Sequence, residues 1–219
     1  MKNLNYFAEN EQASQEQFKQ HRDRAFSGVV ALLVRCNVTP DMLSFVSMLM
    51  LAPFGYLVIN SPEPGVVAIA SLFLLLHVLL DGLDGPLARR LGTAGSAGAF
   101  VDMCCDHGGM IIVTWLVSAA GLIDGTIGNI YVATYTVAVV FIISLNILGS
   151  PLRFVLRSKY LFYILIGGLG WAGARGWLQP PVWIWLDYAL VAFSLANAWI
   201  CCVGFFRIRR ALATRATEG

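Results

Sequence analysis

Long apolar runs separated by short polar breaks dominate this chain. Six such runs lie at about residues 41–60, 66–90, 95–122, 127–148, 154–175 and 179–208. Each is close to the ~20 residues that a helix needs to cross ~30 Å of hydrocarbon. The breaks contain Gly, Pro, Asn and Asp, which interrupt helices. The pattern predicts an all-α integral membrane protein with six transmembrane helices.

The first forty residues have a different pattern. Residues 1–13 are polar, whereas residues 14–35 combine Lys19, Arg22 and Arg24 with an apolar second half. This mixture is typical of an amphipathic helix that lies in the membrane interface. Thr39 can cap the following helix, and Pro40 suits its first position. We therefore expect an N-terminal cytoplasmic or interfacial helix in residues 1–40, a six-helix membrane domain in residues 41–208 and a cytoplasmic tail in residues 209–219.

Composition agrees with a membrane protein. Of the 219 residues, 58% are hydrophobic and only 13% are charged, whereas soluble domains have about 25% charged residues. The five cysteines form two adjacent pairs and a singleton, which is no disulfide framework, and we expect them to be buried as small apolar residues. The bilayer is the expected environment, and no nucleic-acid partner is expected.

The basic residues indicate how the helices are oriented. If both ends of the chain face the cytoplasm, all of the 15 Lys and Arg residues except Arg175 fall on that side. Cytoplasmic loops are enriched in Lys and Arg, so this orientation is the one expected. It places the end of the second span and the start of the third at the cytoplasmic surface. A multi-pass protein of a bacterial inner membrane is the expected setting.

Four aspartates stand out within these two spans: Asp81, Asp84, Asp102 and Asp106. A charged side chain at the bilayer centre costs roughly 2.5–3.5 kcal/mol on insertion scales, and like charges also repel one another. Residues three or four apart share a helix face, so each pair forms one stripe. A short turn makes the two helices antiparallel neighbours, and facing stripes would bring the four carboxylates together.

Bound divalent metal is the expected compensation for this charge, because hard cations take oxygen ligands. Two cations in such a pocket would neutralise phosphate charge and stabilise a leaving group. Arg89, one turn beyond Asp84, can contact a phosphate through its fork of donors. Asp106 lies deepest along the third span, and we therefore expect it to be the general base that deprotonates an attacking hydroxyl.

The same residues carry a family resemblance. The pattern Asp84-Gly85-x2-Ala88-Arg89-x8-Gly98-x3-Asp102-x3-Asp106 matches the signature of the CDP-alcohol phosphotransferases at every fixed position. Asp81 matches a further aspartate that is usual in that family. Thr39 and Pro40 are similar to a family feature near the nucleotide, and six spans after an interfacial helix also look like the family.

The resemblance implies a phospholipid-forming reaction, in which an alcohol attacks the β-phosphorus of a CDP-linked donor and CMP is released. It implies that Asp81, Asp84, Asp102 and Asp106 bind two divalent ions, Mg²⁺ or Mn²⁺, with Asp106 as the catalytic base. The resemblance also implies that the protein forms homodimers. The positions that it assigns to the CDP group are Asp84, Gly85, Ala88, Arg89, Gly98 and Thr39.

The acceptor is less strongly indicated. Arg153, Arg157 and Lys159 form a basic patch at the start of the fifth span, and they can bind a phosphorylated acceptor such as glycerol 3-phosphate. With CDP-diacylglycerol as donor, this is the expected reaction. Alternatively, these three basic residues only anchor the protein at the membrane surface. The enzyme would then join CDP-choline or CDP-ethanolamine to diacylglycerol.

Two other classes of protein remain as alternatives. A divalent-cation transporter would have carboxylates near the midplane and on several spans, whereas these cluster at one end of two spans. An inactive scaffold of the same fold would lack a motif residue, and none is missing here.

Overall fold

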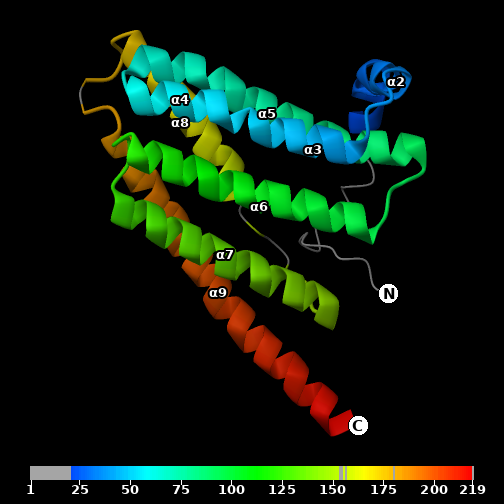
Figure 1. The fold of residues 1–219 in the computed structure, drawn as a ribbon. Coiled ribbons are helices and arrows are strands. Elements are labelled where there is room, and N and C mark those ends of the chain that lie inside the picture. The colour runs from blue at the N-terminus through cyan, green and yellow to red at the C-terminus, as the bar shows by residue number, and fades with distance from the viewer. Residues whose placement is uncertain (1–20, 153–154, 156, 180, 219) are drawn as a thin grey trace.

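The structure is a computed structural model that describes residues 21–152, 155, 157–179 and 181–218. All the regular structure among these residues is helical, which confirms the all-α prediction (Figure 1). The helices are α2 (Ser27–Arg35), α3 (Pro40–Leu49), α4 (Leu51–Asn60), α5 (Pro64–Leu91), α6 (Ser96–Ala119), α7 (Gly125–Leu148), α8 (Ser158–Ala174) and α9 (Ile184–Glu218).

Five helical segments of the described chain are long and apolar enough to cross a membrane. They are Pro40–Asn60, which joins α3 and α4, Pro64–Leu91, Ser96–Ala119, Gly125–Leu148 and Ile184–Ala213. The remaining predicted span, the fifth at residues 154–175, corresponds to α8, which has only 17 residues and is therefore about 25 Å long. An integral membrane protein is confirmed, and the count of six spans is not.

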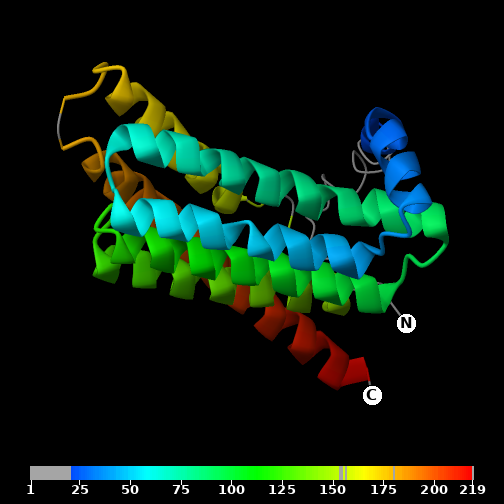
Figure 2. The same ribbon diagram turned by 45° about the horizontal axis from the view of Figure 1, so that its top comes forward.

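Residues 14–20 of the predicted interfacial helix lie outside the described residues. Residues 21–25 are helical, and α2 follows them. Val30 of α2 packs with Leu43 of α3 and with Leu83 and Leu87 of α5. These apolar contacts hold α2 across the end of the bundle, as Figures 1 and 2 show. A position in the membrane interface stays a prediction.

The start of α3 follows the predicted capping. Thr39 has an extended backbone, and its Oγ1 accepts a hydrogen bond of 3.2 Å from the backbone N–H of Met42. Pro40 occupies the first turn, where its missing N–H costs nothing. The cap fixes where α3 begins, and so fixes which of its residues face α5.

The long helices run up and down the bundle. The end of α5, the start of α6 and the C-terminal end of α9 lie at the same end as α2, whereas the connection from α6 to α7 lies at the other (Figure 1). This alternation agrees with the predicted topology, and the cytoplasmic identity of the α2 end stays a prediction. The helix α9 continues to Glu218, through residues that we expected to form a tail.

The main core is apolar and joins several helices. Phe54, Val67, Leu74, Val113 and Ile166, all at most 2% exposed, belong to one cluster that connects α4, α5, α6 and α8. This cluster is the scaffold that holds α5 beside α6. Among the described cysteines none forms a disulfide, and Cys36, Cys104 and Cys202 are exposed, so the expectation that all five are buried is wrong.

The packing of α8 on α5 depends on a glycine. A Cβ atom at Gly170 would lie 2.9 Å from the backbone N of Ala68, closer than real Cβ atoms come, and 3.1 Å from the carbonyl O of Pro64, which is also tight. The two backbones can approach in this way only because Gly170 has no side chain. Gly168, on the same helix, faces open space.

We expect Gly170→Ala to lower the free energy of unfolding by about 1–3 kcal/mol, as overpacking in a filled interface does. The matched control Gly168→Ala should not destabilise the protein. Thermal unfolding of both variants in the same detergent measures the difference. Equal unfolding temperatures for the two variants would contradict this account of the α5–α8 interface.

Candidate metal and phosphate site

Three of the four motif carboxylates meet at the end of the bundle that carries α2. Asp81 and Asp84 extend from α5 and Asp102 from α6, and one carboxylate oxygen of each lies within 4.8 Å of the others. Asp81 and Asp84 are buried, and Asp102 is partly buried. The facing stripes predicted from the sequence are therefore present for these three residues.

The helix α3 also contributes to this site. Ser44 Oγ donates a hydrogen bond of 2.8 Å to Asp84 Oδ2. One turn further along, the carbonyl O of Ser47 lies 2.9 Å from Nδ1 of His77 on α5. These contacts orient Asp84 and hold α3 on α5. No sequence pattern indicates Ser44, because residues 40 positions apart share no helical period.

The three carboxylates fit a divalent cation. Two oxygens that bind one cation at about 2.0–2.6 Å can be at most about 5 Å apart, and the observed group meets this limit. Asp81 Oδ1 is buried and has no hydrogen-bond partner among the described residues. An unpartnered buried carboxylate oxygen is costly, and a cation ligated there removes that cost.

Asp106 has a different partner. Lys159 Nζ pairs with Asp106 Oδ1 and also lies 3.2 Å from the carbonyl O of Asp106. The Lys159 side chain is only 1% exposed. It lies in the first turn of α8, and α8 begins partway along the bundle rather than at the end that carries α2 (Figures 1 and 2). Asp106 is not part of the three-carboxylate group, and its roles as fourth ligand and base stay predictions.

A pocket lies beside Asp106 between α7, α8 and α9. Its polar lining comprises Asp106, Tyr135, Arg157, Tyr160 and Asn197, and its apolar lining comprises Ala138, Val139, Ile142, Val155 and Ile200. Arg157 was expected here, whereas Arg153 lies outside the described residues. Tyr135, Tyr160 and Asn197 were missed, since nothing in their local sequence distinguishes them from packing residues.

The residues that the motif assigns to the nucleotide surround the end of α5. A Cβ atom at Gly85 would lie 3.1 Å from Arg22 Nη2 and 3.4 Å from Arg89 Nη1, so two guanidinium groups flank this glycine. Ala88 is partly buried, and Gly98 is exposed with open space beside it. Thr39 caps α3 at the same end of the bundle.

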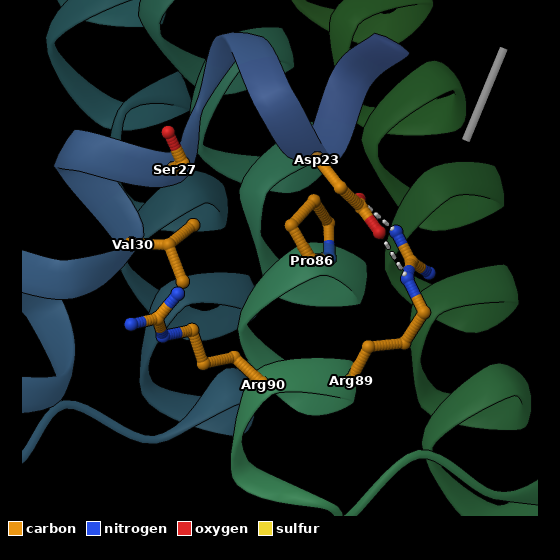
Figure 3. Close-up of a pocket in the computed structure, with 6 residues that line it drawn as sticks. All are labelled: Asp23, Ser27, Val30, Pro86, Arg89 and Arg90. Carbon is orange, nitrogen blue, oxygen red and sulfur yellow. Dashed lines mark hydrogen bonds and ion pairs between the residues drawn. The ribbon is translucent and has the colours of Figure 1, made fainter. Parts of the chain in front are cut away.

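Arg89 is held by a residue that the motif does not include. Its Nε and Nη2 donate to the two carboxylate oxygens of Asp23, at 2.8 and 2.5 Å (Figure 3). This two-point contact is the geometry in which arginine also recognises phosphate. A cleft of about 260 Å³ adjoins the pair, and it is lined by Asp23, Ser27, Val30, Pro86, Arg89 and Arg90.

Together, the helical membrane bundle and the acidic and basic groups at one of its ends describe a class of protein: a membrane enzyme that handles phosphate groups. A model of the CDP-alcohol phosphatidyltransferase family matches residues 37–203. This is more than half of the chain, and the chain therefore belongs to that family. Its members are transferases of phosphate-containing groups.

A solved structure has a similar fold. It is the crystal structure of Mycobacterium tuberculosis phosphatidylinositol phosphate synthase (PgsA1) with CDP-DAG bound. The TM-score is 0.63 at 20% sequence identity, and the match covers 84% of this chain and 94% of that chain. The similarity shows a shared fold. A search of curated protein sequences finds no match.

If the carboxylate group binds a cation, Asp81→Asn should lose that binding without unfolding the protein. Saturating Mn²⁺ at 100 times its Kd should stabilise the wild type by about 2.7 kcal/mol, and this should disappear in the variant. In the absence of metal the variant should be no less stable, because one of three repelling charges is gone. Thermal unfolding with and without Mn²⁺ measures both effects.

The matched control is Asp41→Asn, which removes an exposed carboxylate from the first turn of α3. This variant should keep the full stabilisation by Mn²⁺. Equal Mn²⁺ stabilisation of Asp81→Asn and wild type would show that the cation binds elsewhere.

Proposed function

We propose that this protein transfers a phosphatidyl group from CDP-diacylglycerol to a hydroxyl of a phosphorylated polyol such as glycerol 3-phosphate, with release of CMP. The observation that carries the proposal is the convergence of Asp81, Asp84 and Asp102 from two helices into one group of oxygens. The family match and the complete motif supply the chemistry that this group serves.

Described residues at the end of α5 and the start of α6 can bind the diphosphate part of the donor. Asp81, Asp84 and Asp102 would hold divalent metal, Mg²⁺ or Mn²⁺, which would supply neutralising charge for the diphosphate and for the CMP leaving group. Gly85 leaves its stretch of α5 without a side chain, so that the guanidinium groups of Arg22 and Arg89 can approach the helix where the diphosphate would bind. Arg89, oriented by Asp23, faces the same region.

Asp106 is the base in this proposal. It lines the pocket between α7, α8 and α9, where an acceptor hydroxyl can reach its carboxylate. Lys159 contacts both the side chain and the backbone carbonyl of Asp106, and so fixes the direction of the carboxylate. A positioned carboxylate that takes the proton of an attacking hydroxyl typically contributes 10²–10⁴-fold to the rate. With two ions bound, Asp106 would also help to hold the second one.

The acceptor would occupy the same pocket. Arg157 lies in its wall beside Asp106 and can pair with the phosphate of a phosphorylated polyol. Arg153 is expected to help, as part of the same basic patch. The active site would then lie at the cytoplasmic face of a bacterial inner membrane, in a homodimer.

One observation favours a second candidate function. Half of the lining of this pocket is apolar: Ala138, Val139, Ile142, Val155 and Ile200. An apolar wall suits a lipid acceptor, as in the transfer from CDP-choline or CDP-ethanolamine to diacylglycerol. A cation transporter is less well supported, because the described carboxylate group lies at one end of two helices rather than along a path.

The reaction can be tested with purified protein in detergent. With CDP-diacylglycerol, glycerol 3-phosphate and Mg²⁺, we expect release of CMP that a chelator abolishes. Asp106→Asn should lower the rate by at least about 10²-fold, while Mn²⁺ still raises its unfolding temperature. CMP release that resists the chelator, or full activity of Asp106→Asn, would refute the assignment of metal and base.

A panel of substrates identifies the acceptor. We expect product from CDP-diacylglycerol with a phosphorylated polyol, and none from CDP-choline or CDP-ethanolamine with diacylglycerol, when lipids are scored by mass. Arg157→Ala should raise KM for the phosphorylated acceptor about tenfold or more, as loss of a charged hydrogen bond does, and leave KM for the donor unchanged. If only the CDP-amino alcohols react, Arg157 is an anchor and the second candidate is correct.

A further inference from the structure

The helical residues before α2 reach the motif on α5. Residues 21–25 lie beside the end of α5, and Figure 3 shows Asp23 directed from this segment toward Arg89. The contact joins residues that are 66 positions apart in the sequence. Because residues 21–25 contact the motif through Asp23 and Arg89, a neighbouring side chain of the segment can also contact a ligand bound at the motif.

Arg22 lies directly over the motif glycine. Its Nη2 is 3.1 Å from the position that a Cβ atom of Gly85 would occupy. An electrostatic interaction also links Arg22 with Asp84 and Asp102. Arg22 thus places a positive charge between the carboxylate group and the stretch of α5 that the motif assigns to the nucleotide.

One donor of this guanidinium is unused. Arg22 Nε is buried and has no hydrogen-bond partner among the described residues. A buried charged donor without an acceptor is unfavourable, so a ligand with an oxygen acceptor would bind there readily. Arg89 differs from Arg22 in this respect, because its Nε and Nη2 already donate hydrogen bonds to Asp23.

The charges of the proposed complex also call for a further cation. Asp81, Asp84, Asp102 and the diphosphate together are more negative than two divalent ions can neutralise. Arg89 is partly neutralised by Asp23, whereas Arg22 Nη2 lies beside Gly85 and Arg22 Nε has no partner among the described residues. Phosphate oxygens are the preferred acceptors for such a guanidinium, because both partners are charged.

We propose that Arg22 binds the donor substrate: its guanidinium donates a hydrogen bond to a diphosphate oxygen of the CDP-linked donor above Gly85. In this arrangement Asp23 is a positioning residue that holds Arg89 to one side. The inference rests on the proposed function only in taking a CDP-linked molecule as the ligand at this end of α5. It extends the donor site to a residue outside the motif and outside the membrane helices.

The test is a binding measurement on the full-length protein with CDP as the probe in the presence of Mn²⁺. Arg22→Ala should raise the Kd for CDP about 10–100-fold, the range expected for one charge-assisted hydrogen bond. The matched control is Arg24→Ala, which removes the same charge from an exposed position in the same segment. It should change the Kd by less than about twofold, because a solvated surface charge contributes little.

Two further measurements distinguish binding from a purely structural role. Arg22→Ala should bind Mn²⁺ alone at least as tightly as the wild type, because a cation next to the carboxylates is removed. Arg22→Lys should recover only part of the CDP affinity, since a single ammonium cannot reproduce the fork of a guanidinium. Both variants should keep the unfolding temperature of the wild type to within a few degrees.

The outcomes separate this inference from the proposed function. Mn²⁺-dependent CDP binding by the wild type, with an equal Kd for Arg22→Ala, would overturn the role of Arg22 and leave the proposed function intact. Loss of Mn²⁺ binding in Arg22→Ala would also overturn it, because the arginine would then act through the metal site. Failure of the wild type itself to bind CDP with Mn²⁺ would overturn both.

Discussion

The burial of three like charges where α5 meets α6 is the constraint on which the rest of the site depends. Asp81, Asp84 and Asp102 come within 4.8 Å of one another although two of them are buried. Nothing in their mutual interaction favours this, since like charges repel. The apolar contacts of α5 with α3, α4 and α8 must therefore hold the helices in place. A divalent cation converts this repulsion into ligation, and binding the metal then stabilises the fold.

The cations around the carboxylate group divide the site into two parts. On one side, Arg22 and Arg89 flank Gly85 at the end of α5, where the motif places the nucleotide. On the other side, Lys159 pairs with Asp106 next to the pocket that contains Arg157. A donor that enters from the first side and an acceptor that enters from the second would meet at the carboxylates. The pairing of Lys159 with Asp106 depends on the short length of α8. Because α8 begins partway along the bundle, Lys159 in its first turn lies beside Asp106 of α6.

The sequence predicted the features that repeat with a helical period, and it missed those made by contacts between distant segments. Apolar runs located most of the helices to within a few residues, although α9 extends ten residues beyond its predicted end. The spacing of the four aspartates predicted that all of them converge, and three of them, Asp81, Asp84 and Asp102, form one group. The contact of Ser44 with Asp84 and that of Asp23 with Arg89 join residues 40 and 66 positions apart, and no local pattern specifies them. The count of six spans rested on the length of the apolar run around α8, and length in the sequence does not show where a helix begins.

The location of a bound cation tests the central claim most directly. Crystals grown with Mn²⁺ would give anomalous scattering that reports the position of the metal without reference to activity. The account predicts a peak at about 2.0–2.6 Å from oxygens of Asp81, Asp84 and Asp102. A structure with Mn²⁺ present in which these three carboxylates have no peak between them would contradict it.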